Sequence, residues 1–363
     1  MIISIRDANV TTQGRNEHID IAKGLGILLV VFGHNWLTLN QKGELFNILF
    51  SVSMPLFFFL SGIFFNPLRL FLPTIITKID ALIKPYFVTL TLVALPDLLF
   101  GNLSLSEYVV GMFYGNGSTI KWGPLWFLPH LFIVVISAWI VCFVLENIKA
   151  RRLLKHLLLV SLLLVGTLSI RFFRQVGPTD IGYLHHVLGL PFSLDILPIT
   201  VCYFLLGNDL RDKVMEFRPS KQIVLVSLSV FIGLHYFFDS TIDLNERIYG
   251  NAVVSTAEAL SGIYIILYLA YCLQGHKFIS RFFLKLGNAS LFVFIFHDFF
   301  QSNSFAAASR FLGEKHFFSV VFSFFVGSIF PVLLWSFVKR VDFLALFYLP
   351  IKSNKMIQRF VGK

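Results

Sequence analysis

Two residues in the string HIDIAKGLGILLVVFGHNW, Lys23 and His34, have types and a spacing that could support chemistry. They stand eleven positions apart, which is about three turns of an α-helix, so both side chains lie on one face of a predicted helix. At 1.5 Å per residue, the imidazole lies about 16 Å along the helix axis from the amine. A neutral imidazole in such a place could deprotonate a hydroxyl group. The pattern therefore suggests a base at His34, with a cation on the same stripe.

The same pair also has a structural interpretation. Lys23 would anchor the helix at a membrane surface, and His34 would pack at a helix interface just before Trp36. Ionisable groups within a membrane cost several kcal/mol to insert, so a functional role is the default expectation. Three glycines thin this helix and would let a neighbouring helix or a ligand approach its backbone: Gly24, Gly26 and Gly33.

Other polar and aromatic residues lie near or within apolar stretches. His297, next to Asp298, could orient an acceptor or hydrogen-bond a neighbouring helix. Trp126 could stack on a sugar ring, although tryptophan at this depth is usually an interfacial anchor. Asp195 is expected to cap a helix start, with acceptor binding as the alternative. Glu258 has no evident role beyond pairing with an internal basic group.

The elements that must position these residues are predicted from composition. The chain has 363 residues, of which 56% are hydrophobic and only 14% are charged, and 43 are phenylalanine. Its mean hydropathy is +0.77. A soluble globular protein of this length needs more charged residues on its surface, so we expect much of the surface of this protein to face lipid. The three cysteines stand singly in apolar runs, so we expect no metal site and no disulfide.

Apolar stretches long enough to cross a ~30 Å hydrocarbon core recur along the chain. The predicted spans are residues 21–39, 45–65, 83–100, 124–145, 153–170, 190–209, 222–238, 252–273, 287–303 and 317–338. The fold class is therefore all-α, a polytopic transmembrane bundle of about ten helices. We expect one domain over residues 1–363, with a cytoplasmic segment 1–20 and a cytoplasmic tail 341–363.

The formal charge of +10 could suggest nucleic acid, but its distribution indicates membrane orientation. With the N-terminus inside, 23 of the 30 Lys and Arg residues fall on the cytoplasmic side and 7 on the outside. Positive residues accumulate on cytoplasmic loops, so this alternation supports both the number of helices and cytoplasmic termini. We expect the lipid bilayer as a partner and no nucleic acid.

The chain resembles the acyltransferase-3 family of integral membrane acyltransferases, in particular its fucose 4-O-acetylase-like branch. The resemblance runs through most of the chain. Besides the spacing of Lys23 and His34, it is carried by the strings MPLFFFLSGIFF (54–65), KPYF (84–87), GPLWFLPHLF (123–132), PFSLDILPITVCYFLLGNDLR (191–211) and LGNASLFVFIFH (286–297).

This resemblance implies transfer of an acyl group, commonly acetyl, from cytoplasmic acetyl-CoA, a co-substrate and not a permanently bound cofactor. The acceptors implied are sugar hydroxyls of a cell-surface polysaccharide or its lipid-linked precursor, and the location implied is a bacterial inner membrane. The essential histidine would be His34. The CoA phosphates would be held by Lys23, Arg69 and Lys84, while Lys78 fits ordinary positive-inside bias better. An arginine pair common in the family is absent from TKIDALIKPYF (77–87).

Two mechanisms fit this interpretation: direct transfer with His34 as general base, or an acyl-histidine intermediate. The GxSxG, zinc-ligand and Walker patterns are absent from the sequence. The alternative function is a transporter or flippase for a lipid-linked sugar or small metabolite. The sequence does not define the oligomeric state.

Overall fold

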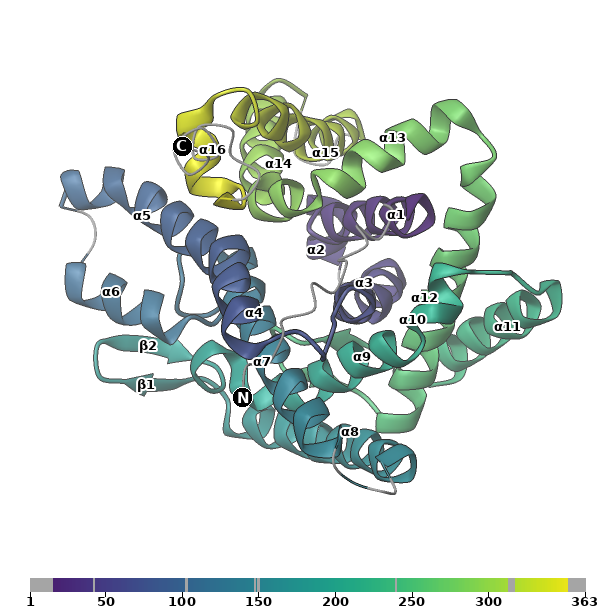
Figure 1. Cartoon of the computed structure of the whole chain (residues 1–363). Helices are drawn as coiled ribbons and strands as arrows, with labels where there is room; N and C mark the ends of the chain where they lie inside the picture. The colour runs from purple at the N-terminus through teal and green to yellow at the C-terminus, as the bar shows by residue number, and fades with distance from the viewer. Residues whose placement is uncertain are drawn as a thin grey trace, which may run out of the picture.

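The computed structural model describes residues 16–41, 43–101, 104–146, 148, 151–238, 240–312 and 317–351. Most of the predicted cytoplasmic segment 1–20 and of the predicted tail 341–363 lies outside these residues. Within them, the all-α prediction is confirmed, and the bundle is helical except for two short hairpins (Figure 1).

The helices, in chain order, have the following bounds. They are α1 (Glu17–Gly33), α2 (Trp36–Gln41), α3 (Glu44–Ile63), α4 (Phe71–Lys78), η1 (Ile79–Ile83), α5 (Lys84–Leu99), α6 (Leu105–Tyr114), η2 (Gly123–Trp126), α7 (Phe127–Glu146), α8 (Arg151–Val176), η3 (Pro191–Ile196), α9 (Leu197–Asp209), α10 (Arg211–Met215), α11 (Lys221–Phe237), α12 (Ala252–Gln274), α13 (Lys277–Asn288), α14 (Ser290–Leu312), α15 (Phe317–Val338) and α16 (Asp342–Tyr348).

Two antiparallel hairpins interrupt the helices. One joins β1 (Thr179–Ile181) to β2 (Leu184–Val187), and the other joins β3 (Ile242–Asp243) to β4 (Ile248–Tyr249). The first follows α8 and leads to η3, and the second joins α11 to α12. The β3–β4 hairpin packs against α3.

Each predicted span has a helical counterpart, but not every counterpart is a long apolar helix. In the described part of the chain, seven helices are long and apolar enough to cross a membrane, and an eighth results if α13 and α14 are counted as one span bent by 83°. The other two counterparts are α1 and α11, each of 17 residues. The chain is thus a multi-pass membrane protein, and the predicted ten spans include two short helices.

The first predicted span, 21–39, ends earlier than expected. Helix α1 stops at Gly33 and α2 begins at Trp36. The Asn35 side-chain oxygen accepts from the Leu37 amide at 3.1 Å and starts the new helix, while its amide nitrogen donates to the Val320 carbonyl of α15 at 3.2 Å. The polar Asn35 side chain therefore breaks the helix directly after His34.

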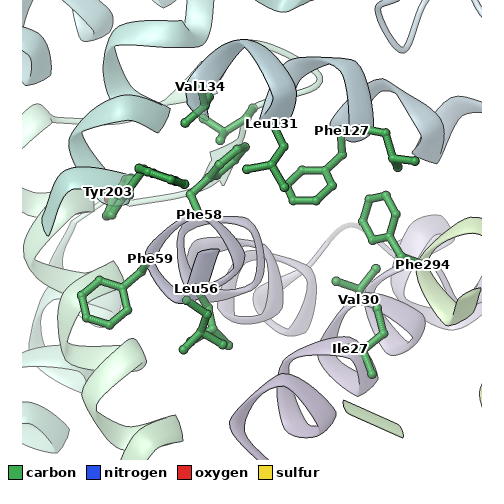
Figure 2. Packing of buried hydrophobic residues seen from close by; sticks show 14 of the residues in the cluster. Ile27, Val30, Leu56, Phe58, Phe59, Phe127, Leu131, Val134, Tyr203 and Phe294 are labelled. Atoms are coloured by element: carbon green, nitrogen blue, oxygen red, sulfur yellow. The ribbon is translucent and has the colours of Figure 1, made fainter. Parts of the chain in front are cut away.

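Helix α3 is the centre of the hydrophobic core. In Figure 2 it is seen end-on, with Leu56, Phe58 and Phe59 pointing outward in different directions toward neighbouring helices. These three side chains are at most 2% exposed. Helices α1, α9 and α12 all pack directly on α3. Because α1 is surrounded by α3, α12, α13 and α14, its polar residues His18 and Asp20 are buried against protein.

Close backbone approach joins the central helices. A side chain at Gly62 of α3 would collide with the Phe204 carbonyl of α9, and one at Gly207 of α9 with the Phe59 carbonyl of α3. Gly24 of α1 meets the Phe283 carbonyl of α13 in the same way. Small residues at such crossings are how membrane helices pack without a hydrophobic driving force. Gly24, predicted to let a neighbour approach the first helix, therefore allows close contact with α13.

Candidate active site

His34 follows the last residue of α1, where the helix opens. Its Nδ1 lies 2.9 Å from the Val30 carbonyl oxygen. A carbonyl only accepts, so Nδ1 carries the proton, and Nε2 of the neutral ring holds a free lone pair. The side chain is half-buried. The backbone of α1 thus fixes both the tautomer and the direction of the basic nitrogen.

A small cavity lies beside this imidazole. Its volume is ≈ 50 Å³, and its wall combines aromatic, aliphatic and polar side chains. It is lined by Val30, His34, Phe50, Ser53, Met54, Pro124, Trp126, Asp243, Asn245 and Phe294. The apolar members keep bulk water away from the basic nitrogen, which strengthens electrostatic interactions there.

A second histidine stands next to the first. The His297 ring of α14 lies 5.0 Å from the His34 ring, centre to centre, in a T-shaped arrangement. Its Nδ1 donates to the carbonyls of Val293 and Phe294 at 2.9 Å each, and its Nε2 is buried without a hydrogen-bond partner. One turn later, both polar side-chain atoms of Gln301 are also buried without a partner. His34, His297 and Gln301 thus form a row of polar side chains, and the last two are buried.

The β3–β4 hairpin supplies a carboxylate to the same cavity. The Asp243 side chain is 7% exposed, and its Oδ1 accepts from the amides of Asn245 and Glu246 at 3.1 Å each. Burial raises the pKa of Asp243 to about 6. Asp243 and His34 line the same cavity from different elements.

A buried ion pair fixes this hairpin. Arg247 is fully buried and forms a two-pronged contact with Asp195, Nε to Oδ2 at 2.8 Å and Nη2 to Oδ1 at 3.1 Å. Asp195 Oδ1 also accepts from the Leu190 amide at 2.9 Å. The predicted capping role for Asp195 is wrong, because neither η3 nor α9 has a side-chain cap. Its carboxylate is committed to Arg247, and it does not line the His34 cavity.

Lys23 lies near the other end of α1. Its Nζ is 3.2 Å from Asp20 Oδ1 and 4.2 Å from the centre of the ring of Phe64, which directly follows α3. His34 also contacts α3, through the Phe50 ring at 5.8 Å. Both side chains therefore project toward α3, in agreement with the predicted shared face. The residues that line the His34 cavity do not include Lys23.

The other predicted phosphate contacts are basic residues with different partners. The charges of Arg69 and Lys23 both act on Lys78, so these three cations lie near one another. The Lys84 Nζ pairs with Asp80 Oδ1 at 2.5 Å and donates to the Leu349 carbonyl at 2.7 Å. The ammonium of Lys84 is thus already partly neutralised.

Sequence reasoning found some of these residues and missed others. Trp126 lines the cavity, and its role as an acceptor contact stays a prediction. Asp243 and Asn245 were missed, since a polar hairpin sequence resembles an ordinary solvated loop, and Gln301 of α14 was missed as well. The groups of His, Cys, Asp and Glu in the described ranges show no arrangement of three that could hold a metal ion.

The comparisons with known proteins give one match. A family model for an acyltransferase domain matches residues 16–341, which begin with the first described residue of the chain and include both histidines. No curated protein and no solved structure matches the chain.

Proposed function

Because the chain belongs to the acyltransferase-3 family, we propose that it is an O-acetyltransferase. The donor is cytoplasmic acetyl-CoA, and the acceptor is a sugar hydroxyl of a cell-surface polysaccharide or its lipid-linked precursor in a bacterial inner membrane. The single observation that carries the assignment of the base is the His34 tautomer. Its Nδ1 is committed to Val30, so Nε2 is left free beside a cavity of ≈ 50 Å³.

The chemistry of the transfer is direct. The acceptor hydroxyl gives its proton to His34 Nε2 while its oxygen attacks the thioester carbonyl. The new bond joins oxygen to the acetyl carbon, and the carbon–sulfur bond breaks. The CoA thiolate leaves and takes up the proton that His34 carries. Holding both reactants in one water-poor place supplies much of the acceleration.

The basic residues at the other end of α1 support the donor part of the proposal. CoA has an anionic head and a long thin arm that ends in the thioester. Lys23 and Arg69 would hold the phosphates, together with Lys78. Eleven residues of helix separate Lys23 from His34, about 16 Å, so an extended arm could span the distance between cluster and base.

The experiment that tests this function compares membranes that contain the wild type or His34→Ala, each supplied with radiolabelled acetyl-CoA. Transfer of label to alkali-labile esters is expected to fall by about 100-fold or more, because general-base catalysis contributes 10²–10⁴-fold. His276→Ala is the matched control, since His276 lies exposed at the start of α13. Equal labelling by wild type and His34→Ala would remove His34 from the mechanism. A wild type that moves substrate without acylating anything would favour a transporter.

A further inference from the structure

Several polar atoms around His34 accept hydrogen bonds. His34 Nε2 and His297 Nε2 are lone pairs, because each Nδ1 donates its proton to a backbone carbonyl. The Asp243 carboxylate has two oxygens, and the contacts to Asn245 and Glu246 use only Oδ1. The Asn245 side-chain oxygen Oδ1 is buried without a hydrogen-bond partner.

Such a surface favours one class of ligand. A buried acceptor without a donor is costly, so a molecule that brings several O–H donors gains most from entering this cavity. Aromatic rings complete the wall, with Trp126 5% exposed and Phe50 and Phe294 on other sides. Aromatic faces with carboxylate and amide oxygens suit the apolar faces and hydroxyl edges of a sugar ring.

The cavity is too small for a whole sugar. A volume of ≈ 50 Å³ holds a few water molecules. It therefore fits the hydroxyl-bearing edge of a ring. Asp243 and His34 line this same small space from different elements, so two neighbouring hydroxyls of one edge could reach both of them.

We propose that the β3–β4 hairpin forms an acceptor subsite for a vicinal diol, in which Asp243 accepts a hydrogen bond from the hydroxyl adjacent to the one that His34 deprotonates. Asp243 is then the residue that selects and orients the acceptor. The ion pair between Arg247 and Asp195 fixes the hairpin on which Asp243 lies. This inference rests on the proposed transferase function.

The test uses Asp243→Asn in the full-length chain, purified in detergent. Asparagine keeps an oxygen for the two backbone amides of the turn, so the hairpin is expected to fold. Radiolabelled acetyl-CoA is the donor, and membranes from a strain that lacks the protein supply the acceptor. We expect the KM for these membranes to rise and kcat/KM to fall about 10- to 100-fold, the range for losing a hydrogen bond to a charged group. CoA binding, measured by calorimetry, is expected to stay unchanged.

Two further arms make the test specific. Asp180→Asn is the matched control, because Asp180 lies exposed on the other hairpin. Pretreating the acceptor membranes with periodate, which cleaves vicinal diols, followed by quenching, should abolish labelling by the wild type.

Each outcome bears on a different claim. Normal transfer by Asp243→Asn, or a fall in kcat with no change in acceptor KM, would overturn the subsite. Labelling that survives periodate treatment would contradict the claim that the acceptor is a vicinal diol. Loss of CoA binding in Asp243→Asn would show that the residue acts on the fold. A wild type that labels nothing would instead overturn the proposed function.

Discussion

Asp243 is the residue at which stability and function oppose each other. A carboxylate that is 7% exposed loses hydration, and only backbone amides compensate for it. Its pKa rises from 3.8 to about 6 because of this burial. A shift of this size corresponds to about 3 kcal/mol at neutral pH. A cost of this order is typical of a group retained for its chemistry.

The sign of the pH dependence follows from linkage. Between pH 4 and 6 the folded protein binds a proton on Asp243 that the unfolded chain has released, so stability falls as the pH rises through this window. We therefore predict that Asp243→Asn raises the melting temperature at pH 7.5 and raises it by only about half as much at pH 5, midway through this window. Thermal unfolding in detergent at both pH values measures this. A variant that melts lower than wild type at pH 7.5 would contradict the assigned cost.

What could be predicted about single residues depended on sequence distance. Lys23 and His34 lie on one helix, so a period of 3.6 was enough to place them on one side, and both indeed face α3. Asp195 and Arg247 are 52 positions apart, and their pairing depends on how η3 meets the hairpin. No local pattern encodes such a contact. For the same reason Asp243 could not be placed beside His34 from the sequence.

At the scale of elements, buried polar contacts connect helices. His235 of α11 lies 3.0 Å from the buried Glu258 of α12 and 2.9 Å from the exposed Glu44 of α3. This answers the expectation that Glu258 has an internal basic partner. Breaking such a buried pair on one side leaves an uncompensated charge, which is costly. These contacts therefore fix the register of α3 against the hairpin-bearing helices.

The α3–α9 crossing tolerates no added methyl group. A Cβ at Gly207 would collide with the Phe59 backbone carbonyl, which cannot rotate away as a side chain could. We predict that Gly207→Ala destabilises the protein by about 1–3 kcal/mol, the usual cost of overpacking. Melting temperature and residual acyl transfer of the purified full chain would both fall.

Gly233→Ala is the matched control for this substitution. Gly233 lies in α11, and a Cβ there would meet no atom within 4 Å. Alanine has the higher helix propensity, by up to about 1 kcal/mol, so this variant should be as stable as wild type or slightly more stable. Equal melting temperatures for the two variants would mean that α3 and α9 are not in close contact.

The arrangement of the whole molecule explains why the number of spans was harder to predict than the fold class. Helices α8 and α15 are apolar around their circumference and leave large side chains exposed, as expected next to lipid. Helix α1 carries Glu17, Asp20 and Lys23 and is enclosed by its neighbours, as its central place in Figure 1 illustrates. A helix that lipid does not touch need not be apolar. Hydropathy alone therefore does not identify α1, the helix that directly precedes the proposed base His34, as a membrane-spanning helix.

Orientation follows from the charge count and gives a prediction for the whole molecule. The β1–β2 hairpin and α10 lie on either side of one span, η3 with α9, so they should face opposite compartments. Tyr183 is 64% exposed on the hairpin, and Lys213 is exposed on α10. In a background without Cys142, Cys202 and Cys272, a cysteine at position 183 should react with an impermeant maleimide in intact cells. A cysteine at position 213 should react only after permeabilisation, because the positive-inside bias places α10 in the cytoplasm. The reverse pattern would invert the protein and put the cluster of Lys23 and Arg69 on the side that lacks CoA.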